Sequence, residues 1–255
     1  MRKVFIDFEP EMFGISRMHE YEHEWSPHRW TYLSKTDDCI TDMEAKLSRL
    51  KALAPNHQQV VCLGDRSNFR YSVLHSYKSN RLGVRKAAGY HVLRQWLMDT
   101  FETVVLKGCE ADDAVGVSAG PNDLIYSIDK DLGTIAGNHL NPDGSRYEVT
   151  ELDAERAFWK QVLVGDSADG YKGCPKIGAA CKLFEEEDWL TCITEKHFWD
   201  LVYSKFLGAA KELLKRHDIA DPLHYCVQTA RVARILRPGE YDHDTETPVL
   251  WRVPS

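Results

Sequence analysis

The chain has 255 residues, of which 43% are hydrophobic and 11% aromatic, enough for one large domain or a main domain with a smaller companion. A net charge of -7 argues against a protein that coats nucleic acid through charge alone, and no apolar run approaches the ~18 residues of a membrane helix. Seven cysteines without a C-x-x-C pair favour reduced thiols in a cytoplasmic protein over a disulfide framework.

In chain order, four short and continuous apolar runs predict buried parallel strands, at residues 4–6, 60–63, 103–106 and 124–128. Helical patterns lie between them. Apolar residues recur at helical spacing over 40–53 before Pro55, a second helix is expected over about 88–101, and a third follows Glu110. Strands that alternate with helices predict an α/β fold with a mainly parallel central sheet and flanking helices.

After residue 150 the apolar pattern becomes helical. Turns are expected at 165–178 and at Asp221-Pro222, where Asp can cap a helix and Pro can take its first position. We therefore expect an α/β body over residues 1–150 and a mainly helical portion over 151–255 that packs on it.

Acidic residues follow every predicted strand. Asp7 ends the first and Asp65 follows the second, and the later ones are Glu110, Asp112 and Asp113 after the third and Asp129 and Asp131 after the fourth. Because the carboxyl ends of parallel strands form the ligand crevice of an open sheet, these acids should gather at one edge. Asp166 and Asp169 are three residues apart, and one helical turn would present both on the same side.

These acids also have an ordinary structural interpretation. An Asp after a strand is usually a turn former, and Asp112 or Asp113 could simply favour a helix N-terminus. Several clusters at one edge, however, would resist ionisation unless cations neutralised them. Two hard divalent ions about 4 Å apart would do so and could clamp a phosphodiester. Oxygen ligands favour Mg²⁺ or Mn²⁺ over zinc.

Basic residues concentrate in residues 66–98, which contain no Asp or Glu. Lys78, Arg81 and Arg85 fall at i, i+3 and i+7, which would form one stripe of a helix. The alternative is a solvated helix face. A local basic strip on an acidic protein suggests a polyanion held near an acidic site.

A glycine-bounded turn, Gly173-Cys-Pro-Lys-Ile-Gly178, precedes a helix predicted from Ala179 to about Glu187. Backbone N–H groups at a helix N-terminus can bind a phosphate without reading sequence. Lys172, Lys176 and Lys182 nearby favour that interpretation over an ordinary Gly-Pro connection.

Together, Glu110-Ala-Asp-Asp113, Ser127-Ile-Asp-Lys-Asp131, Gly165-Asp-Ser-Ala-Asp-Gly170 and the turn at 173–178 resemble the 5′-nuclease (flap endonuclease) superfamily in the right order. Tyr77-Lys78-Ser79-Asn80-Arg81 is similar to that family's basic helical segment. The resemblance spans nearly the whole chain and is greatest to the 5′–3′ exonucleases of short-tailed bacteriophages. One departure is Asp7-Phe8-Glu9, where the family usually has Asp followed by a small residue; bulky Phe8 could narrow the site.

The resemblance implies a PIN-like fold, a location in the host cytoplasm if the chain is viral, and a 5′–3′ exonuclease that hydrolyses duplex DNA with two metal ions. Cutting of 5′ flaps and of RNA in RNA–DNA hybrids is a further expectation. One metal would be served mainly by Asp7, Asp65, Glu110 and Asp112. The second would be served by Asp113, Asp129, Asp131, Asp166 and Asp169.

The resemblance also assigns roles to the basic residues. Lys78 would orient the scissile phosphate from a helical arch, together with Arg81, and Tyr77 would stack on a base near the cut. The family holds duplex DNA with a helix–turn–helix, often with a potassium ion. The expected DNA-binding residues are Arg70, Arg85, Lys172, Gly173, Lys176, Gly178 and Lys182.

Three alternatives remain open at this point. His19-Glu20-Tyr-Glu-His23 matches the H-E-x-x-H signature of zinc peptidases, although that motif normally lies in an apolar buried helix. A non-catalytic DNA-binding protein on the same scaffold is suggested by Phe8 and Glu9, but the complete set of other acids argues against it. An RNA-directed nuclease of related fold is less favoured because of the DNA-holding turn.

Overall fold

The computed structural model describes residues 2–81, 83–217 and 219–254, and they form two compact units. Unit 1 comprises Met1–Arg66, Gly83–Leu132 and Gly137–Glu148, and unit 2 comprises Ser67–Leu82, Gly133–Ala136 and Val149–Ser255. The division differs from the expected one because two segments from the first 150 residues belong to unit 2. The chain therefore passes back and forth between the units.

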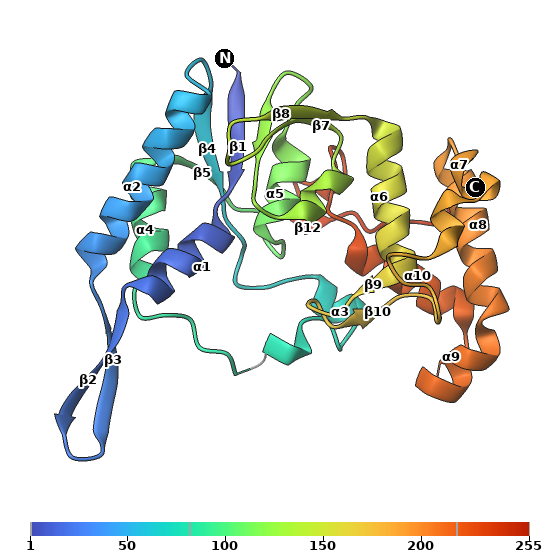
Figure 1. Ribbon diagram of the computed structural model, residues 1–255, viewed down its shortest axis with the longest axis horizontal. Helices are drawn as coiled ribbons and strands as arrows, with labels where there is room; N and C mark the ends of the chain where they lie inside the picture. The colour runs from blue at the N-terminus through green and yellow to red at the C-terminus, as the bar shows by residue number, and fades with distance from the viewer. Residues whose placement is uncertain (1, 82, 218, 255) are drawn as a thin grey trace. The chain divides into compact units, whose positions relative to one another are not determined.

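Unit 1 contains a six-stranded sheet of order β5-β4-β1-β6-β7-β8 (Figure 1). Its strands are β1 (Lys3–Asp7), β4 (Gln58–Cys62), β5 (Glu102–Val104), β6 (Leu124–Tyr126), β7 (Gly137–Leu140) and β8 (Arg146–Val149). β1 pairs in parallel with β4 and β6, so that Phe5 lies opposite both Val60 and Ile125. The pairs β4–β5 and β6–β7 are also parallel. The mainly parallel sheet expected from the apolar runs is confirmed.

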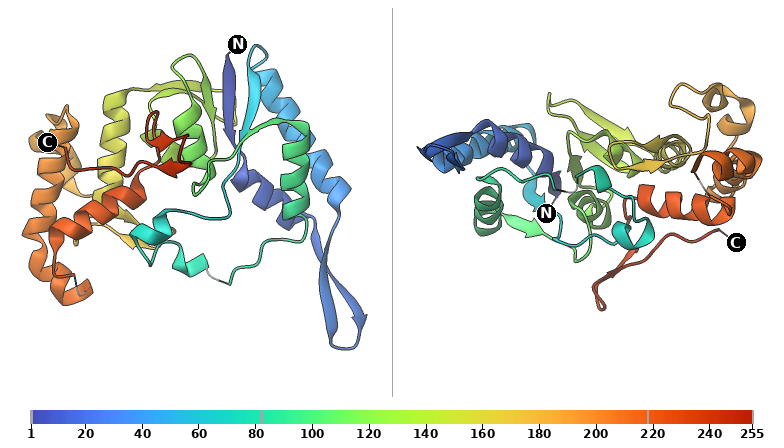
Figure 2. Two further views of the ribbon diagram at one scale, coloured as in Figure 1. Left: turned by 180° about the vertical axis from the view of Figure 1, so that it is seen from behind. Right: turned by 90° about the horizontal axis from the view of Figure 1, so that it is seen from below.

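Helices α1 (Glu9–Met18), α2 (Thr36–Leu53) and α4 (Tyr90–Thr100) pack together on one side of this sheet (Figures 1 and 2). The spacing predicted over 40–53 places Met43, Leu47 and Leu50 in the core, each no more than 2% exposed. They share a hydrophobic cluster with the strand residues Ile6 and Val61. Helix α5 (Ala111–Ser118) contacts β1 and β4. Phe8 is 1% exposed and belongs to the same core cluster, so its ring stabilises the fold and does not narrow a site.

A feature that the apolar pattern did not predict is the antiparallel hairpin of β2 (Glu20–Ser26) and β3 (Arg29–Ser34). Figure 1 shows it as a ribbon that extends away from α1 and α2. Its sequence alternates Glu20, Glu22 and Glu24 with ring-bearing residues. An alternation with a period of two is typical of a β-strand. The apolar pattern did not reveal it because neither face of the hairpin consists of aliphatic side chains.

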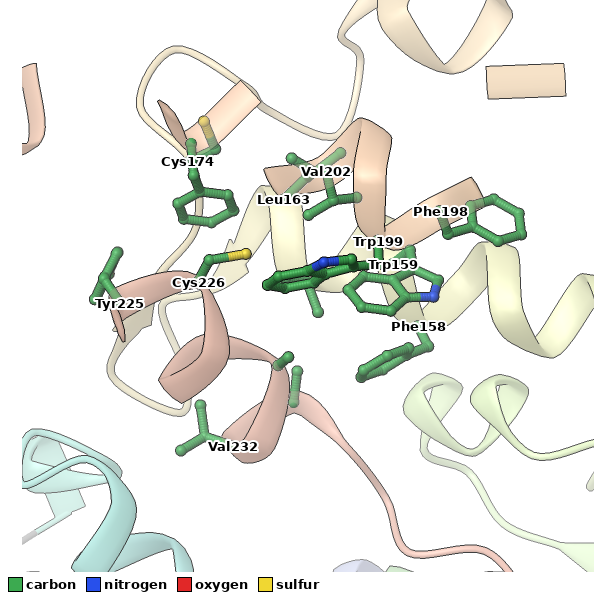
Figure 3. Packing of buried hydrophobic residues seen from close by; sticks show 14 of the residues in the cluster. Phe158, Trp159, Leu163, Cys174, Phe198, Trp199, Val202, Tyr225, Cys226 and Val232 are labelled. Atoms are coloured by element: carbon green, nitrogen blue, oxygen red, sulfur yellow. The ribbon is translucent and has the colours of Figure 1, made fainter. Parts of the chain in front are cut away.

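Unit 2 is mainly helical. Its elements are α3 (Arg70–Val73), η1 (Ser79–Arg81), α6 (Glu151–Val164), β9 (Gly165–Asp166), β10 (Tyr171–Lys172), η3 (Lys182–Glu185), α7 (Glu187–Leu190), α8 (Glu195–Gly208), α9 (Ala210–His217), α10 (Pro222–Ala233), β11 (Tyr241–Asp242) and β12 (Thr247–Pro248), while η2 (Lys130–Thr134) begins in unit 1. α6, α8 and α10 contact one another around buried Trp159, beside Trp199 and Phe158 (Figure 3).

Asp221 accepts a hydrogen bond from the His224 amide and Pro222 opens α10, as predicted. Among the described residues, no helix combines the length and the apolar character needed to cross a membrane.

Two expected helices are not formed by the described residues. Instead of a helix from Ala179 to Glu187, the chain makes a turn, the short 3₁₀ helix η3 and the separate helix α7. Glu187 and Asp188 lie in the first turn of α7, where the helix dipole favours acids that would repel one another inside a continuous helix. The stripe expected over 78–85 is also absent, since Lys78 has φ +48° and only η1 follows it. Residue 82, within this expected arch, lies outside the described residues.

Candidate functional site

The carboxyl ends of β1 and β6 are joined through a hydroxyl group. Asp7 is the last residue of β1, and Ser127 Oγ donates a hydrogen bond of 3.1 Å to its Oδ2. The amide of Asp129 in turn donates to Ser127 Oγ at 2.9 Å. Ser127 was quoted in the sequence only as the first residue of a motif and was given no role, although it directly follows the buried strand β6. Two of the predicted acids therefore lie around one serine.

The loops that follow β4 and β5 are joined by two hydrogen bonds. The amide of Asp65 donates to the carbonyl of Cys109 at 2.8 Å, and the amide of Gly108 donates to Asp65 Oδ2 at 2.9 Å. Glu9, the departure noted in the sequence, accepts a 3.0 Å hydrogen bond from the amide of Gly64. A Cβ atom at Gly64 would lie 3.3 Å from Glu9 Oε1 and in ordinary contact, at 3.5 Å, with Glu110 Cα. Residue 64 therefore lies beside both Glu9 and the start of α5.

The acids at the start of α5 form a capping box. The amide of Glu110, the N-cap residue, donates to Asp113 Oδ2 at 3.0 Å, and the Glu110 carboxylate accepts from the Asp113 backbone. Asp113 is fully buried, while Asp112 and Glu110 are partly exposed. The geometry gives Asp113 a clear role in capping, which is the structural interpretation considered for it above.

Asp7 has an unusual electrostatic environment. Its side chain is 4% exposed, and burial raises its pKa from 3.8 to about 7, with nearby Glu9 and Asp129 adding to the rise. Hydrogen bonds from the Glu9 amide and from Ser127 oppose this rise but do not cancel it. A carboxylate in such surroundings is stabilised by a nearby cation, because the cation favours the charged form.

Asp131, which was predicted at the end of the fourth strand, lies beyond that strand in η2. Its amide donates to Asp129 Oδ1 at 2.9 Å, so the two residues are linked through a turn. We name the group Asp7, Glu9, Asp65, Glu110 and Asp129 the acidic edge of unit 1. Across the described ranges, no three His, Cys, Asp or Glu side chains converge as a ready set of ligands to one metal ion.

In unit 2, Asp169 gathers basic groups from the predicted arch segment. Its carboxylate lies 2.9 Å from Arg81 Nη2 and 3.6 Å from Lys78 Nζ. The amide of Lys78 donates to the carbonyl of Asp169 at 2.7 Å, and Asn80 Nδ2 donates to the carbonyl of Ala168. We name this arrangement of residues 76–81 on residues 166–170 the basic clasp.

The clasp depends on a glycine. Gly170 has φ +75°, and a Cβ there would lie 2.7 Å from the carbonyl oxygen of Ser76. The spacing suggested that Asp166 and Asp169 share a helical turn, but they do not lie on a helix. Asp166 Oδ1 instead accepts the amides of Ala168 and Asp169 in a turn after β9, which brings the two acids together by a different route.

Tyr77 does not present its ring for stacking on a base in this structure. It is 2% exposed and lies in the core of unit 2, where it stacks on Tyr171 at 6.5 Å between ring centroids. Its hydroxyl donates to Asp169 Oδ2 at 3.1 Å. The ring is buried because an aromatic side chain is more stable packed in the core than exposed. Through its hydroxyl, Tyr77 helps to hold Asp169 in the basic clasp.

Two arginines expected to bind DNA have other partners. Arg70 is 1% exposed, and its guanidinium donates to the carbonyls of Val232 and Arg234, so it stabilises the interior of unit 2. Arg85 forms a two-pronged ion pair with Glu20 at the base of the hairpin, at 2.6 and 2.7 Å. Burial makes Arg70 inaccessible to DNA, and Arg85 does not share a helical stripe with Lys78 and Arg81.

The glycine-bounded turn is only partly exposed. Gly173 is buried against the backbone, since a Cβ there would lie 2.1 Å from the carbonyl oxygen of Leu163. Gly178 is exposed, as are Lys172, Lys176 and Lys182, and Lys176 Nζ lies 3.3 Å from Glu212. Without a helix at Ala179, the expected helix N-terminus for a phosphate is missing. Only the lysines and Gly178 remain available to DNA.

The H-E-x-x-H match does not form a zinc site. His19 caps the end of α1 and pairs with Asp42 at 2.7 Å, Glu20 pairs with Arg85, and His23 lies in β2. The motif requires its histidines on adjacent turns of one helix. In an extended strand, residues four apart are separated by roughly 13 Å. The structure contradicts the zinc-peptidase interpretation.

Comparisons with known proteins bear directly on this arrangement. No family model matches the chain. It is similar to the exonuclease of Escherichia phage T7, at 25% identity over a 272-residue alignment that covers 91% of this chain and 87% of that protein. The chain thus resembles exonucleases of the 5′-nuclease superfamily over most of its length. A 5′-3′ exonuclease of Buchnera aphidicola (subsp. Schizaphis graminum) is 29% identical over 152 residues, about half of each chain.

The fold of the superfamily is also seen in a solved structure. The catalytic core of Rad2, in complex with DNA substrate, has a TM-score of 0.51 and 15% identity, covering 99% of this chain and 82% of that chain. This likeness concerns the fold alone. Within the 5′-nuclease fold, the acidic edge of this chain lies where an open parallel sheet places its ligands, at the carboxyl ends of the strands.

Proposed function

We propose that this chain is a member of the 5′-nuclease superfamily and a metal-dependent 5′–3′ exonuclease that hydrolyses phosphodiester bonds in DNA. The observation that carries the proposal is the acidic edge, where carboxylates follow four parallel strands and buried Asp7 has Glu9 and Asp129 nearby. The similarity to the T7 exonuclease over most of both chains supports the same reaction.

The donor set fits a hard divalent cation. Asp7, Asp65, Glu110 and Asp129 supply only oxygen atoms. Burial, with smaller contributions from Glu9 and Asp129, raises the pKa of Asp7, and a bound cation would favour its charged form. We propose that these residues, with Asp112, hold Mg²⁺ or Mn²⁺. When bound, a pair of such ions would activate water and neutralise the charge that develops on the phosphate. Asp131, Asp166 and Asp169 remain proposed ligands that act directly or through water.

The residues of the chain have their own tasks in this proposal. Ser127 orients Asp7, and the capping box of Glu110 and Asp113 fixes the start of α5. In unit 2, Asp169 positions Lys78 and Arg81, whose cations we propose bind the phosphate backbone of the substrate. Lys172, Lys176, Gly178 and Lys182 are proposed contacts to duplex DNA, with a potassium ion at this turn as a further possibility of the family.

The experiment is a product-length analysis on 5′-labelled duplex, 5′-flap and RNA–DNA substrates. Mg²⁺ or Mn²⁺ should support stepwise release from the 5′ end, whereas Ca²⁺ should permit binding with little turnover. Full cleavage in excess EDTA would overturn metal dependence. Binding without any cleavage in Mg²⁺ would instead favour the non-catalytic DNA-binding protein.

A further inference from the structure

The β2–β3 hairpin carries large aromatic side chains that no core uses. The exposed fractions are 44% for Tyr21, 65% for Trp25, 58% for Trp30 and 45% for Tyr32. None of the four belongs to either hydrophobic cluster. Exposed aromatic groups gathered on one element are typical of an interaction surface, because burying them elsewhere would otherwise stabilise the fold.

The hairpin is held firmly at its base. Glu20 accepts hydrogen bonds from Arg85 and, at 2.7 Å, from the amide of Ala88. The Arg85 guanidinium also lies 3.9 Å from the centre of the Tyr32 ring. This anchoring orients the ribbon relative to α4 and leaves its distal half exposed.

The two faces of the hairpin differ in charge. Along β2, side chains alternate, so that Tyr21, His23 and Trp25 share one face and Glu22 and Glu24 share the other. A bulge occurs between Glu24 and Ser26, yet the Trp25 ring still lies 4.3 Å from the His23 ring. The first face thus carries three rings and no carboxylate.

The second face has a different character. Glu24 lies opposite Trp30 and Glu22 lies opposite Tyr32, so its aromatic rings are interleaved with carboxylates. Carboxylates at these positions repel a phosphate backbone. At the turn between the strands, exposed His28 and Arg29 offer groups that can donate hydrogen bonds to phosphate. On the second face the only cation described is Arg85, which lies at the base and pairs with Glu20, so Glu22 and Glu24 disfavour a polyanion over the distal part of that face.

We propose that this face of the hairpin binds a single-stranded segment of the nucleic acid substrate by stacking bases on Trp25 and Tyr21. Stacking suits an unpaired strand because its bases are free to lie on an aromatic ring, and it is tolerant of sequence. The inference rests on the proposed function, since it names a further contact with the same substrate.

The test compares Trp25→Ala with Trp30→Ala, the same change on opposite faces of one hairpin. Binding of labelled oligothymidine and of blunt duplex is measured by fluorescence anisotropy in Ca²⁺. Trp25→Ala should weaken binding of oligothymidine by about 5- to 150-fold, the range for loss of one stacked base, and should weaken duplex binding less. Trp30→Ala should stay within about twofold of the parent chain. Circular dichroism should show both variants folded, because both side chains are exposed.

The outcomes separate the two proposals. Equal losses in both variants, or an unchanged affinity for oligothymidine in Trp25→Ala, would overturn the stacking face while the parent chain still cut duplex DNA. That result would point to a protein partner for the hairpin. A parent chain that neither bound nor cut any DNA in Mg²⁺ would overturn the proposed function itself.

Discussion

Asp7 in unit 1 and Asp169 in unit 2 show two ways of keeping a carboxylate in a folded protein. Asp7 is buried, receives hydrogen bonds from an amide and a hydroxyl, and lies near Glu9 and Asp129, which raise its pKa further. Asp169 has Lys78, Arg81 and the Tyr77 hydroxyl around it. The charged form of Asp7 would therefore be stabilised by a cation bound from solution. Asp169 is instead neutralised by Lys78 and Arg81, and these ion pairs fix the positions of the two basic side chains.

The largest expected effect comes from removing a charge of the acidic edge. Asp129→Asn keeps the shape of the side chain but loses a ligand charge, and cleavage should fall by at least about 10³-fold, because bound metal contributes several kcal/mol to the transition state. DNA binding should survive or strengthen, since a group that repels phosphate is gone. Single-turnover cleavage and anisotropy measure the two effects.

The matched control is Asp123→Asn. Asp123 precedes the same strand β6 but lies at its opposite end, where it accepts the amide of Lys3. The cleavage rate of the Asp123→Asn variant should remain near that of the parent chain. If Asp129→Asn cut DNA normally, the acids of this edge would have to be reinterpreted as structural.

A smaller effect is expected in the basic clasp. Lys78→Ala should slow the chemical step by roughly 10²-fold, the cost of losing one charge-stabilising group, and should weaken DNA binding much less. Lys196→Ala, which breaks an exposed ion pair with Asp200 in the same unit, is the control and should change neither. An unchanged single-turnover rate in Lys78→Ala would leave the clasp as a purely structural contact.

The third effect concerns stability. The folded-state pKa of Asp7 is about 7, above its usual 3.8, so the stability that its protonated form contributes is present below about pH 4 and is lost as the pH rises through 7. In EDTA, Asp7→Asn should be more stable than the parent chain at pH 8 by up to roughly 2–3 kcal/mol, and the two should converge near pH 4. Urea denaturation at both pH values measures this, and a parallel pH dependence of the two proteins would contradict it.

Much of unit 1 could be predicted because its strands are continuous apolar runs. Such runs mark strands buried on both faces, and the acids that follow them necessarily reach one edge of a parallel sheet. The hairpin was missed for the opposite reason. Glu20, Glu22 and Glu24 alternate with ring-bearing residues, and this period of two is typical of a strand. The segment has no aliphatic run, however, and it also matches H-E-x-x-H, a motif that favours a helix.

The arrangement of the basic residues could not be predicted from spacing. Lys78 takes a left-handed backbone conformation because its amide binds the carbonyl of Asp169, a partner 91 positions away in the chain. The ion pair of Arg85 with Glu20 and the burial of Arg70 are likewise set by contacts between distant segments. Local periodicity carries no information on such contacts, so the spacing of Lys78, Arg81 and Arg85 predicted a helix that does not form.

The interleaved path of the chain has a consequence for how the protein can be made and divided. Unit 2 uses residues 67–82, and Arg70 within them binds carbonyls more than 160 residues later. A fragment that began at residue 151 would lack this arginine and would leave those buried carbonyls without their donor. Such a fragment should therefore be less stable than the same region within the full chain, and Arg70 can take its place only after the C-terminal helices have been synthesised.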